Sequence, residues 1–88
     1  MVDNRTMNSP KLIDAVAGRL SKYMGERNLT QYKLAQLCNV PFTTVKSIMQ
    51  RRANGVTLKT LILIADGLKI PVSEFMDDPS FNVDNLDL

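Results

Sequence analysis

The 88-residue sequence has no histidine, no tryptophan and a single cysteine, and these shortages exclude several classes of protein. Without histidine the chain lacks the commonest general base and the commonest metal ligand, so neither a catalytic centre nor a zinc site is expected. One cysteine cannot form an intramolecular disulfide, and secreted domains of this size usually need disulfides. We therefore expect a protein that is not an enzyme, binds no metal or cofactor, and resides in the reducing cytoplasm.

Long hydrophobic runs are also missing. The longest apolar stretch is Leu61–Ala65, whereas a membrane-spanning helix needs roughly 20 apolar residues. Residues 1–11 are polar and contain no run of the signal-peptide type. These features predict a soluble, cytoplasmic chain that does not contact a membrane.

Acidic residues are absent from the middle of the chain. Residues 27–65 carry six lysines and arginines and no aspartate or glutamate, whereas residues 66–88 carry six acids and one lysine. The overall net charge of +2 therefore hides a strongly polarised distribution. A polyanion would meet the middle of the chain, and the acidic end would be repelled from it.

The hydrophobic residues, 44% of the sequence, are mainly Leu, Ile, Val, Ala and Met, which favours packed helices in one domain. Apolar residues at spacings of three and four predict a first helix from Ser9-Pro10 to Asn28. Ser9 is a suitable N-cap, Pro10 suits the first helical position, and Asn28 tolerates the left-handed conformation that ends many helices. Residues 1–8 show no periodicity and are predicted to form a flexible arm.

Four shorter helices are predicted to follow, so that the expected fold is all-α with five helices. Thr30 and Thr57 are good N-caps for the second and fourth of the five. Asn39 tolerates a positive φ and would end the second, and Pro71 would stop the fourth. The predicted segments are helices over 31–37 and 41–50, a loop over 51–56, a helix between 57 and 71, a last helix over 72–76, and an acidic, irregular tail over 77–88.

Residues 31–50 carry the motif on which the functional prediction depends. Two short helices joined by a tight turn need a small residue where their axes approach, and Ala35 is small. The turn needs a residue that accepts a left-handed conformation, and Asn39 does. Cys38 is interpreted as core because it lies at a buried position of this pattern. The apolar residues expected to face the body are Leu34, Cys38, Val40, Val45 and Ile48, which completes a helix-turn-helix pattern.

With this motif the sequence resembles the Cro and phage-repressor type of helix-turn-helix proteins, the XRE family. The similarity runs from about Leu12 to Met76. The stretch LTQYKLAQLCNV resembles the opening of the family motif, and LKTLILIADGLKIPVSEFM resembles its closing segment. The resemblance implies a five-helix, lambda-repressor-like DNA-binding domain over residues 9–76. It also implies a transcriptional regulator, a repressor, that binds double-stranded DNA as a homodimer.

The chain departs from the family pattern at several positions. Asn39 replaces the usual turn glycine, and Pro41 replaces a Ser or Thr cap, so one hydrogen bond is expected to be missing at the start of the third helix. Met24 and Met49 stand where many members pair a basic residue with an acid. A thioether contact in place of that ion pair need not lower stability.

The resemblance implies that the exposed side of residues 41–50 enters the major groove, with the first turn deepest. An aromatic ring can press on a thymine methyl, hydroxyls can bond base edges, and a lysine can reach guanine acceptors. The predicted base-contacting residues are Phe42, Thr43, Lys46 and Ser47. The predicted contacts to the DNA backbone are Gln31, Tyr32, Lys33, Thr44, Gln50, Arg51, Arg52 and Asn54.

Each of these residues has a structural alternative. Thr43 and Thr44 would also suit a solvated first helical turn, and Phe42 would also cover the edge of the core or a dimer contact. Arg51 and Arg52 would also be ordinary solvated loop charges. Their place beside the third helix, in a span without acids, favours phosphate contact.

A protein-interaction module, such as an antitoxin-like partner binder, is the competing function. The tail, with apolar residues from Phe81 to Leu88, is the candidate surface for a protein partner or a second subunit. A module that bound only protein would be free to carry acids on the surface that faces DNA, and this sequence carries none there. DNA binding is therefore the favoured prediction.

Overall fold

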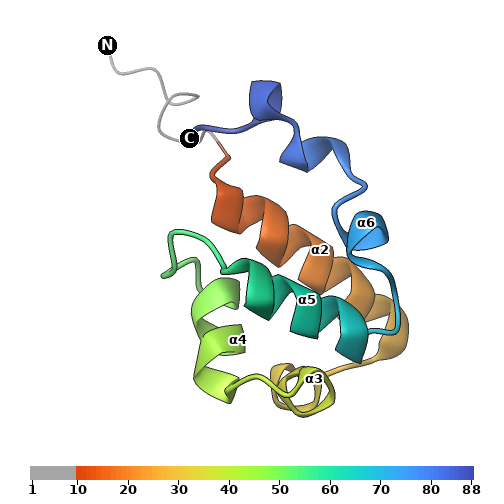
Figure 1. Cartoon of the computed structure of the whole chain (residues 1–88). Helices are drawn as coiled ribbons and strands as arrows, with labels where there is room; N and C mark the ends of the chain where they lie inside the picture. The colour runs from red at the N-terminus through yellow and green to blue at the C-terminus, as the bar shows by residue number, and fades with distance from the viewer. Residues whose placement is uncertain (1–9) are drawn as a thin grey trace.

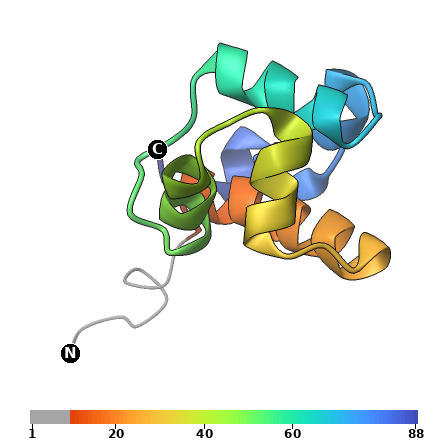
Figure 2. The same ribbon diagram turned by 90° about the horizontal axis from the view of Figure 1, so that it is seen from below.

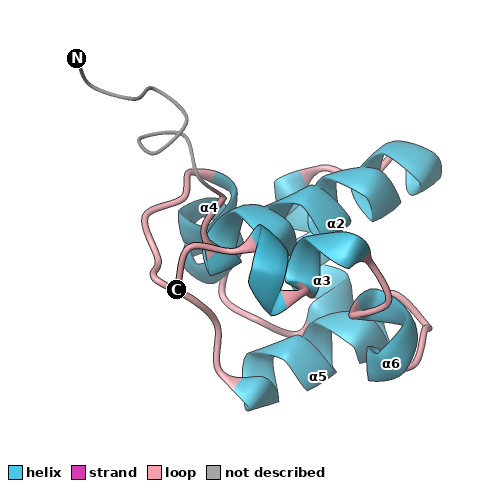
Figure 3. Ribbon diagram, turned by 90° about the horizontal axis from the view of Figure 1, so that it is seen from above, coloured by secondary structure: helices cyan, strands magenta, loops and turns pink. Residues whose placement is uncertain are grey.

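The longest helix, α2 (Leu12–Arg27), runs through the middle of the molecule and turns an apolar stripe toward the other helices (Figure 1). Ile13, Val16 and Leu20 in this stripe are almost wholly buried. The computed structural model describes residues 10–88, and over that range the chain forms five α-helices, two 3-10 turns and no strand (Figure 3). The all-α fold class is confirmed.

The start of α2 lies two residues later than predicted. Lys11 is the N-cap, and its backbone N–H donates a hydrogen bond to Asp14 Oδ2 at 2.8 Å. Because this carboxylate satisfies a free N–H at the helix start, it sets the boundary there. Pro10 therefore precedes the helix, and the predicted Ser9 cap and the arm over 1–8 lie outside the described residues.

Asparagine and threonine set the next three helix boundaries as predicted. Asn28 and Asn39 adopt the left-handed conformation, each with a φ of 55°, at the C-caps of α2 and of α3 (Gln31–Cys38). Thr30 Oγ1 accepts a hydrogen bond from the Lys33 N–H at 3.0 Å. The Thr30 hydroxyl satisfies one free N–H at the start of α3, and the left-handed backbone of Asn39 turns the chain out of the helix, which is why the short α3 has sharp limits.

The third predicted helix is α4 (Phe42–Met49), one residue shorter at each end than the predicted range. Pro41 is its N-cap and supplies no side-chain hydrogen bond, as the sequence indicates. Met24 and Met49 are half-buried against the core. An apolar side chain fits that environment without the desolvation cost of an ion pair.

Helix α5 (Leu58–Gly67) begins as predicted, because Thr57 Oγ1 accepts the Thr60 N–H at 3.1 Å. Its C-cap is Leu68, the last apolar residue of the predicted helix. Lys69 has a φ of 61°, and this left-handed residue turns the chain out of the helix. Pro71 follows the C-cap Leu68 by three residues and prevents the helix from continuing, as predicted, whereas the sequence does not mark the left-handed turn at Lys69.

Pro71 also forms the N-cap of α6 (Val72–Phe75). Arg19 of α2 ties this short helix to the body. Its Nε donates to the Phe75 carbonyl oxygen at 2.8 Å and its Nη2 donates to the Glu74 carbonyl oxygen at 2.7 Å. The buried Arg19 side chain thus satisfies two backbone acceptors at the end of α6.

Helices α3 and α5 approach each other closely at Cys38 and Gly67. A Cβ atom on Gly67 would lie 2.5 Å from Cys38 Cα and 2.6 Å from its Sγ, so only glycine fits. The Cys38 side chain is buried, as predicted. Burial raises the pKa of this thiol to about 11, with a smaller contribution from the charge of Asp66, so the thiol is neutral near pH 7.

Residues 77–88 are only partly irregular, which corrects the prediction of an irregular tail in part. They form the 3-10 turns η1 (Pro79–Phe81) and η2 (Val83–Asn85) and lie near the start of α2 (Figure 1). The Phe81 ring lies 6.4 Å from the Phe75 ring and packs at the edge of the core. Partial burial of this aromatic ring stabilises the folding of the segment back onto the helices.

Polar contacts complete the attachment of this segment. The Asp87 N–H donates to the Pro10 carbonyl oxygen at 2.7 Å, and Lys11 Nζ lies 3.4 Å from Asp87 Oδ2. Asp78 caps η1 by accepting the Ser80 N–H at 3.0 Å. Hydrogen bonds from the Ser80 hydroxyl and backbone N–H lower the pKa of the Asp78 carboxyl, which keeps it ionised.

Candidate nucleic-acid interface

Helices α3 and α4 form a two-helix unit joined by a tight turn over residues 39–41. Figure 2 shows the two helices side by side, with the segment between α4 and α5 curving outward beside α4. The inner sides of both helices are buried in the core, as the sequence pattern predicts. The buried residues of the unit are Leu34, Ala35, Cys38, Val40, Val45 and Ile48.

The outer side of α4 carries the residues predicted to contact bases. Phe42, Thr43 and Lys46 are exposed, and Ser47 is half-buried. Because they lie three and four positions apart, Thr43, Lys46 and Ser47 share one face of the helix. That face is hollowed, and its lining residues are Thr43, Lys46, Ser47, Gln50 and Arg52. The fold therefore brings predicted base-contacting and backbone-contacting residues together.

A second hollow lies between α4 and the start of α5 and has a volume of about 330 Å³. Thr57 and Thr60 add hydroxyls to it, and Thr57 Oγ1 and Thr60 Oγ1 are 3.0 Å apart. From the sequence Thr57 is predicted only to cap a helix, because its place beside α4 depends on the tertiary fold. The hollow is lined by Thr43, Thr44, Ser47, Ile48, Ala53, Gly55, Val56, Thr57 and Thr60.

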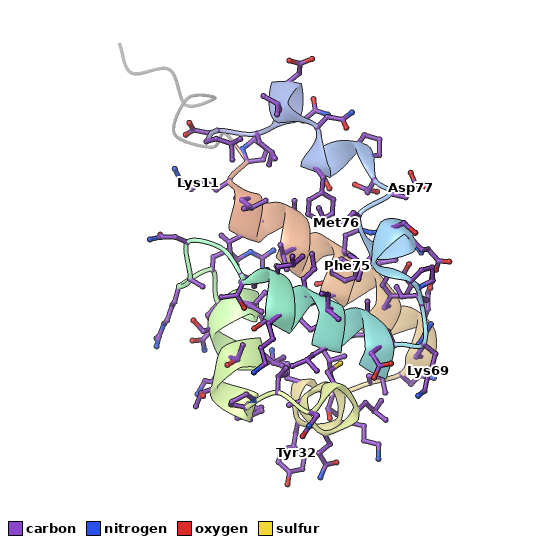
Figure 4. The ribbon with its side chains drawn as sticks, viewed as in Figure 1. Lys11, Tyr32, Lys69, Phe75, Met76 and Asp77 are labelled. Atoms are coloured by element: carbon purple, nitrogen blue, oxygen red, sulfur yellow. The ribbon has the colours of Figure 1, made fainter. Side chains whose placement is uncertain are left out.

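Tyr32 and Phe42 lie against each other at the outer end of the two-helix unit. Their ring centroids are 6.0 Å apart, with the ring planes tilted by 59°. Tyr32 is 60% exposed and Phe42 is 40% exposed. Figure 4 shows Tyr32 at the opposite end of the molecule from Asp77. An aromatic pair of this geometry holds the Phe42 ring in place at the first turn of α4.

The start of α3 adjoins this pair. Thr30 accepts the Lys33 N–H, but the N–H groups of the first helical residues have no acceptor within the helix. These groups and the helix dipole favour an anion at this end. Gln31 is half-buried there and Lys33 is exposed, so both are placed to add to such a contact.

The two arginines that follow α4 differ in their contacts. Arg51 has a φ of 57°, its Nε lies 3.4 Å from Asp14 Oδ1, and its Nη1 donates to the Met49 carbonyl oxygen at 2.7 Å. Arg52 is exposed and forms no ion pair within residues 10–88. Asn54 is also exposed on this loop. Arg52 is thus the arginine that is open to a ligand, and Arg51 is held by α2.

The two-helix unit and its surroundings match a known family. The model of the Cro/C1-type HTH DNA-binding domain matches residues 19–80, which is most of the chain. The chain belongs to this family. No curated protein and no solved structure matches it. Membership confirms the resemblance inferred from the sequence, and it assigns DNA binding to the domain.

The charge distribution of this Cro/C1-type domain agrees with an anionic ligand at the two-helix unit. Acids are absent from residues 27–65, which include α3, α4 and the following loop. Asp14, a neighbouring acid on α2, is paired with Arg51. The acidic 3-10 turns lie at the far end of the molecule from the turn between α3 and α4 (Figure 1). A phosphate backbone would meet a face free of repelling carboxylates.

In the part of this Cro/C1-type domain that the structure describes, no helix combines the length and the apolar character needed to cross a membrane. No group of three or more His, Cys, Asp or Glu side chains in residues 10–88 is placed to hold a metal ion.

Proposed function

We propose that this Cro/C1-type domain is a sequence-specific transcriptional regulator that places α4 in the major groove of duplex DNA. The observation that carries the proposal is the single acid-free face on which Thr43, Lys46 and Ser47 lie next to Arg52. An α-helix fits the major groove, where each base pair presents its own pattern of donors, acceptors and methyl groups. A domain bound in this way over a promoter represses transcription by excluding the polymerase.

The side chains divide between reading bases and gripping phosphates. Phe42 contacts a thymine methyl, Thr43 and Ser47 bond base edges, and Lys46 reaches guanine. The start of α3, from Gln31 to Lys33, binds one phosphate, and Arg52 binds another. The remaining backbone contacts are assigned to Thr44, Gln50 and Asn54, and Arg51 acts through its bond to Asp14 rather than on DNA.

Two copies act together in the proposed complex. One copy offers few base-reading side chains on α4, which limits the discrimination that it can achieve alone. Two copies related by a two-fold axis would read a near-palindromic site with half-sites about 34–36 Å apart. The partner-binding alternative has less support, because Phe81 of the C-terminal segment is packed on the chain's own core.

Selection of bound duplexes from a random pool tests the proposal. We expect enrichment of a near-palindromic sequence whose half-sites are one helical turn apart, and a steep fall in affinity as salt is added. A pool without enrichment would contradict sequence-specific binding. Enrichment of a single, non-palindromic half-site would contradict the two-copy arrangement.

Arg52→Ala is expected to weaken binding to every duplex by about tenfold at low salt. It should also reduce the slope of log affinity against log salt by about 0.9, the contribution of one phosphate contact. Arg51→Ala removes the same charge and is the matched comparison. Its expected loss is smaller and should leave the salt slope nearly unchanged, because Arg51 pairs with Asp14 and donates to the Met49 carbonyl oxygen rather than to a phosphate. Fluorescence anisotropy over a range of salt concentrations measures both variants. Equal effects of the two substitutions would refute the assignment of the phosphate contact to Arg52.

Lys46→Ala is expected to change which base is preferred at one position of the site. Loss of a specific contact costs about 1–3 kcal/mol for the preferred base pair and leaves the other positions unchanged. Lys33→Ala removes an exposed lysine from α3 and serves as control, with an even loss across all sequences. Binding to a set of duplexes with single base-pair changes measures both. If Lys46→Ala lowered the affinity for all duplexes equally, Lys46 would contact a phosphate and not a base.

A further inference from the structure

Helix α5 has a second apolar face that no described part of the chain covers. Leu61, Ile64 and Leu68 are buried in the core. On another side of the helix, Leu58 is 69% exposed and Ile62, one turn later, is 48% exposed. The described C-terminal segment folds near the start of α2 (Figure 1), and Leu58 and Ile62 remain exposed.

Opposite charges flank the exposed Ile62. Lys59 precedes it by three residues and Asp66 follows it by four, so all three lie on one side of α5. Both charged residues are exposed, and neither forms an ion pair with another residue of the described range 10–88. A positive end, an apolar centre and a negative end make this side of the helix complementary to an inverted copy of itself.

We propose that two copies of this chain meet through α5, packed antiparallel against the partner's α5 on the two-fold axis of the DNA complex. An axis between Ile62 and Leu63 brings Lys59 opposite the partner's Asp66 and Asp66 opposite the partner's Lys59. Ile62 lies at the centre, beside the partner's Ile62 and the partner's Leu63, and Leu58 lies toward the edge of the contact. The inference rests on the proposed function, since it names the surface that joins the two copies on DNA.

The small size of this contact determines when it forms. A ten-residue helix is about 15 Å long, and two such helices bury much less than the roughly 1,600 Å² of a standard stable interface. The dimer is therefore weak in free solution and is stabilised when both copies occupy one duplex. The start of α5 lies beside α4 at the threonine-lined hollow, so the contact adjoins the DNA-binding face.

Charge reversal tests the pairing. The measured quantity is the affinity for the full selected site divided by the affinity for an isolated half-site. Lys59→Glu and Asp66→Lys should each lower this ratio by about tenfold, since each places two like-charged pairs across the axis. The double variant Lys59→Glu/Asp66→Lys should restore the ratio. An equal mixture of the two single variants should also restore it, because opposite charges face each other in the mixed dimer.

The α5 interface would be overturned if neither single variant changed the ratio of full-site to half-site affinity. It would also be overturned if the single variants lowered this ratio and neither the double variant nor the mixture restored it. If the proposed function itself is wrong, the random pool yields no enriched site, and the affinity ratio cannot be measured. The α5 interface is then tested without DNA, by disulfide cross-linking. Ile62→Cys should give a disulfide-linked dimer under mild oxidation at high protein concentration, whereas the control Val83→Cys, 71% exposed, should not. Equal cross-linking of the two variants would also overturn the interface.

Discussion

Gly67→Ala is expected to destabilise the domain by at least about 3 kcal/mol, near the upper end of the cost of overpacking a core. The added Cβ would meet Cys38 Cα at 2.5 Å, Cys38 Sγ at 2.6 Å and the Leu37 carbonyl oxygen at 2.7 Å. Two of these atoms belong to the backbone of α3, so relief requires α3 and α5 to separate. Since small domains are stable by only about 5–15 kcal/mol, this is a large fraction of the total.

Gly25→Ala is the matched control, because it also places alanine in a helix but meets no atom within 4 Å. The better helix propensity of alanine should raise stability there by about 0.5–1 kcal/mol. Urea unfolding followed by circular dichroism measures both variants. If Gly67→Ala proved as stable as Gly25→Ala, the close approach of α3 and α5 would be wrong. We also expect Gly67→Ala to weaken DNA binding, since α3 positions α4.

Arg19→Met is expected to cost about 2–4 kcal/mol, because it leaves two buried or half-buried carbonyl oxygens without a donor. The guanidinium donates to the carbonyl oxygens of Phe75 and Glu74 and also to the Tyr23 hydroxyl at 3.2 Å. Methionine fills similar space but can donate to none of them. The substitution should lower the free energy of unfolding of the whole domain and also make α6 open more often, since these hydrogen bonds attach α6 to α2.

Lys22→Met on the same helix is the control. Lys22 is exposed and pairs with Glu26 at 3.2 Å, an exposed ion pair whose loss should change stability by less than about 0.5 kcal/mol. Urea unfolding gives the global effect, and amide hydrogen exchange in α6 gives the local one. Similar stability and exchange for the two variants would show that Arg19 does not anchor α6.

The elements that could be predicted from the sequence are those with local causes. Thr30 and Thr57 cap helices by accepting hydrogen bonds from N–H groups three residues away. The left-handed conformation of Asn39 is a preference of that residue alone. The helix-turn-helix pattern is equally local, because its buried positions repeat along two short neighbouring helices. For these reasons the fold class and the α3–α4 unit are both recognisable from the sequence.

The features that the sequence did not reveal depend on distant partners. In the sequence Arg19 is indistinguishable from the other charged residues of its helix. Its role depends on the two carbonyl oxygens of α6, which lie beside it only in the folded chain. Arg51 and Arg52 are indistinguishable in the sequence, and only the fold places Asp14 beside the first of them. The pairing of Tyr32 with Phe42 likewise needs α3 and α4 in their final places.

Methylation interference on the selected duplex tests the central claim, that α4 lies in the major groove. Methylation of guanine N7 modifies the major groove, whereas methylation of adenine N3 modifies the minor groove. We predict interference by N7 methylation at two patches about one helical turn apart, and we predict that Lys46→Ala removes part of each patch. Interference confined to adenine N3, or N7 interference that no α4 substitution alters, would contradict this account.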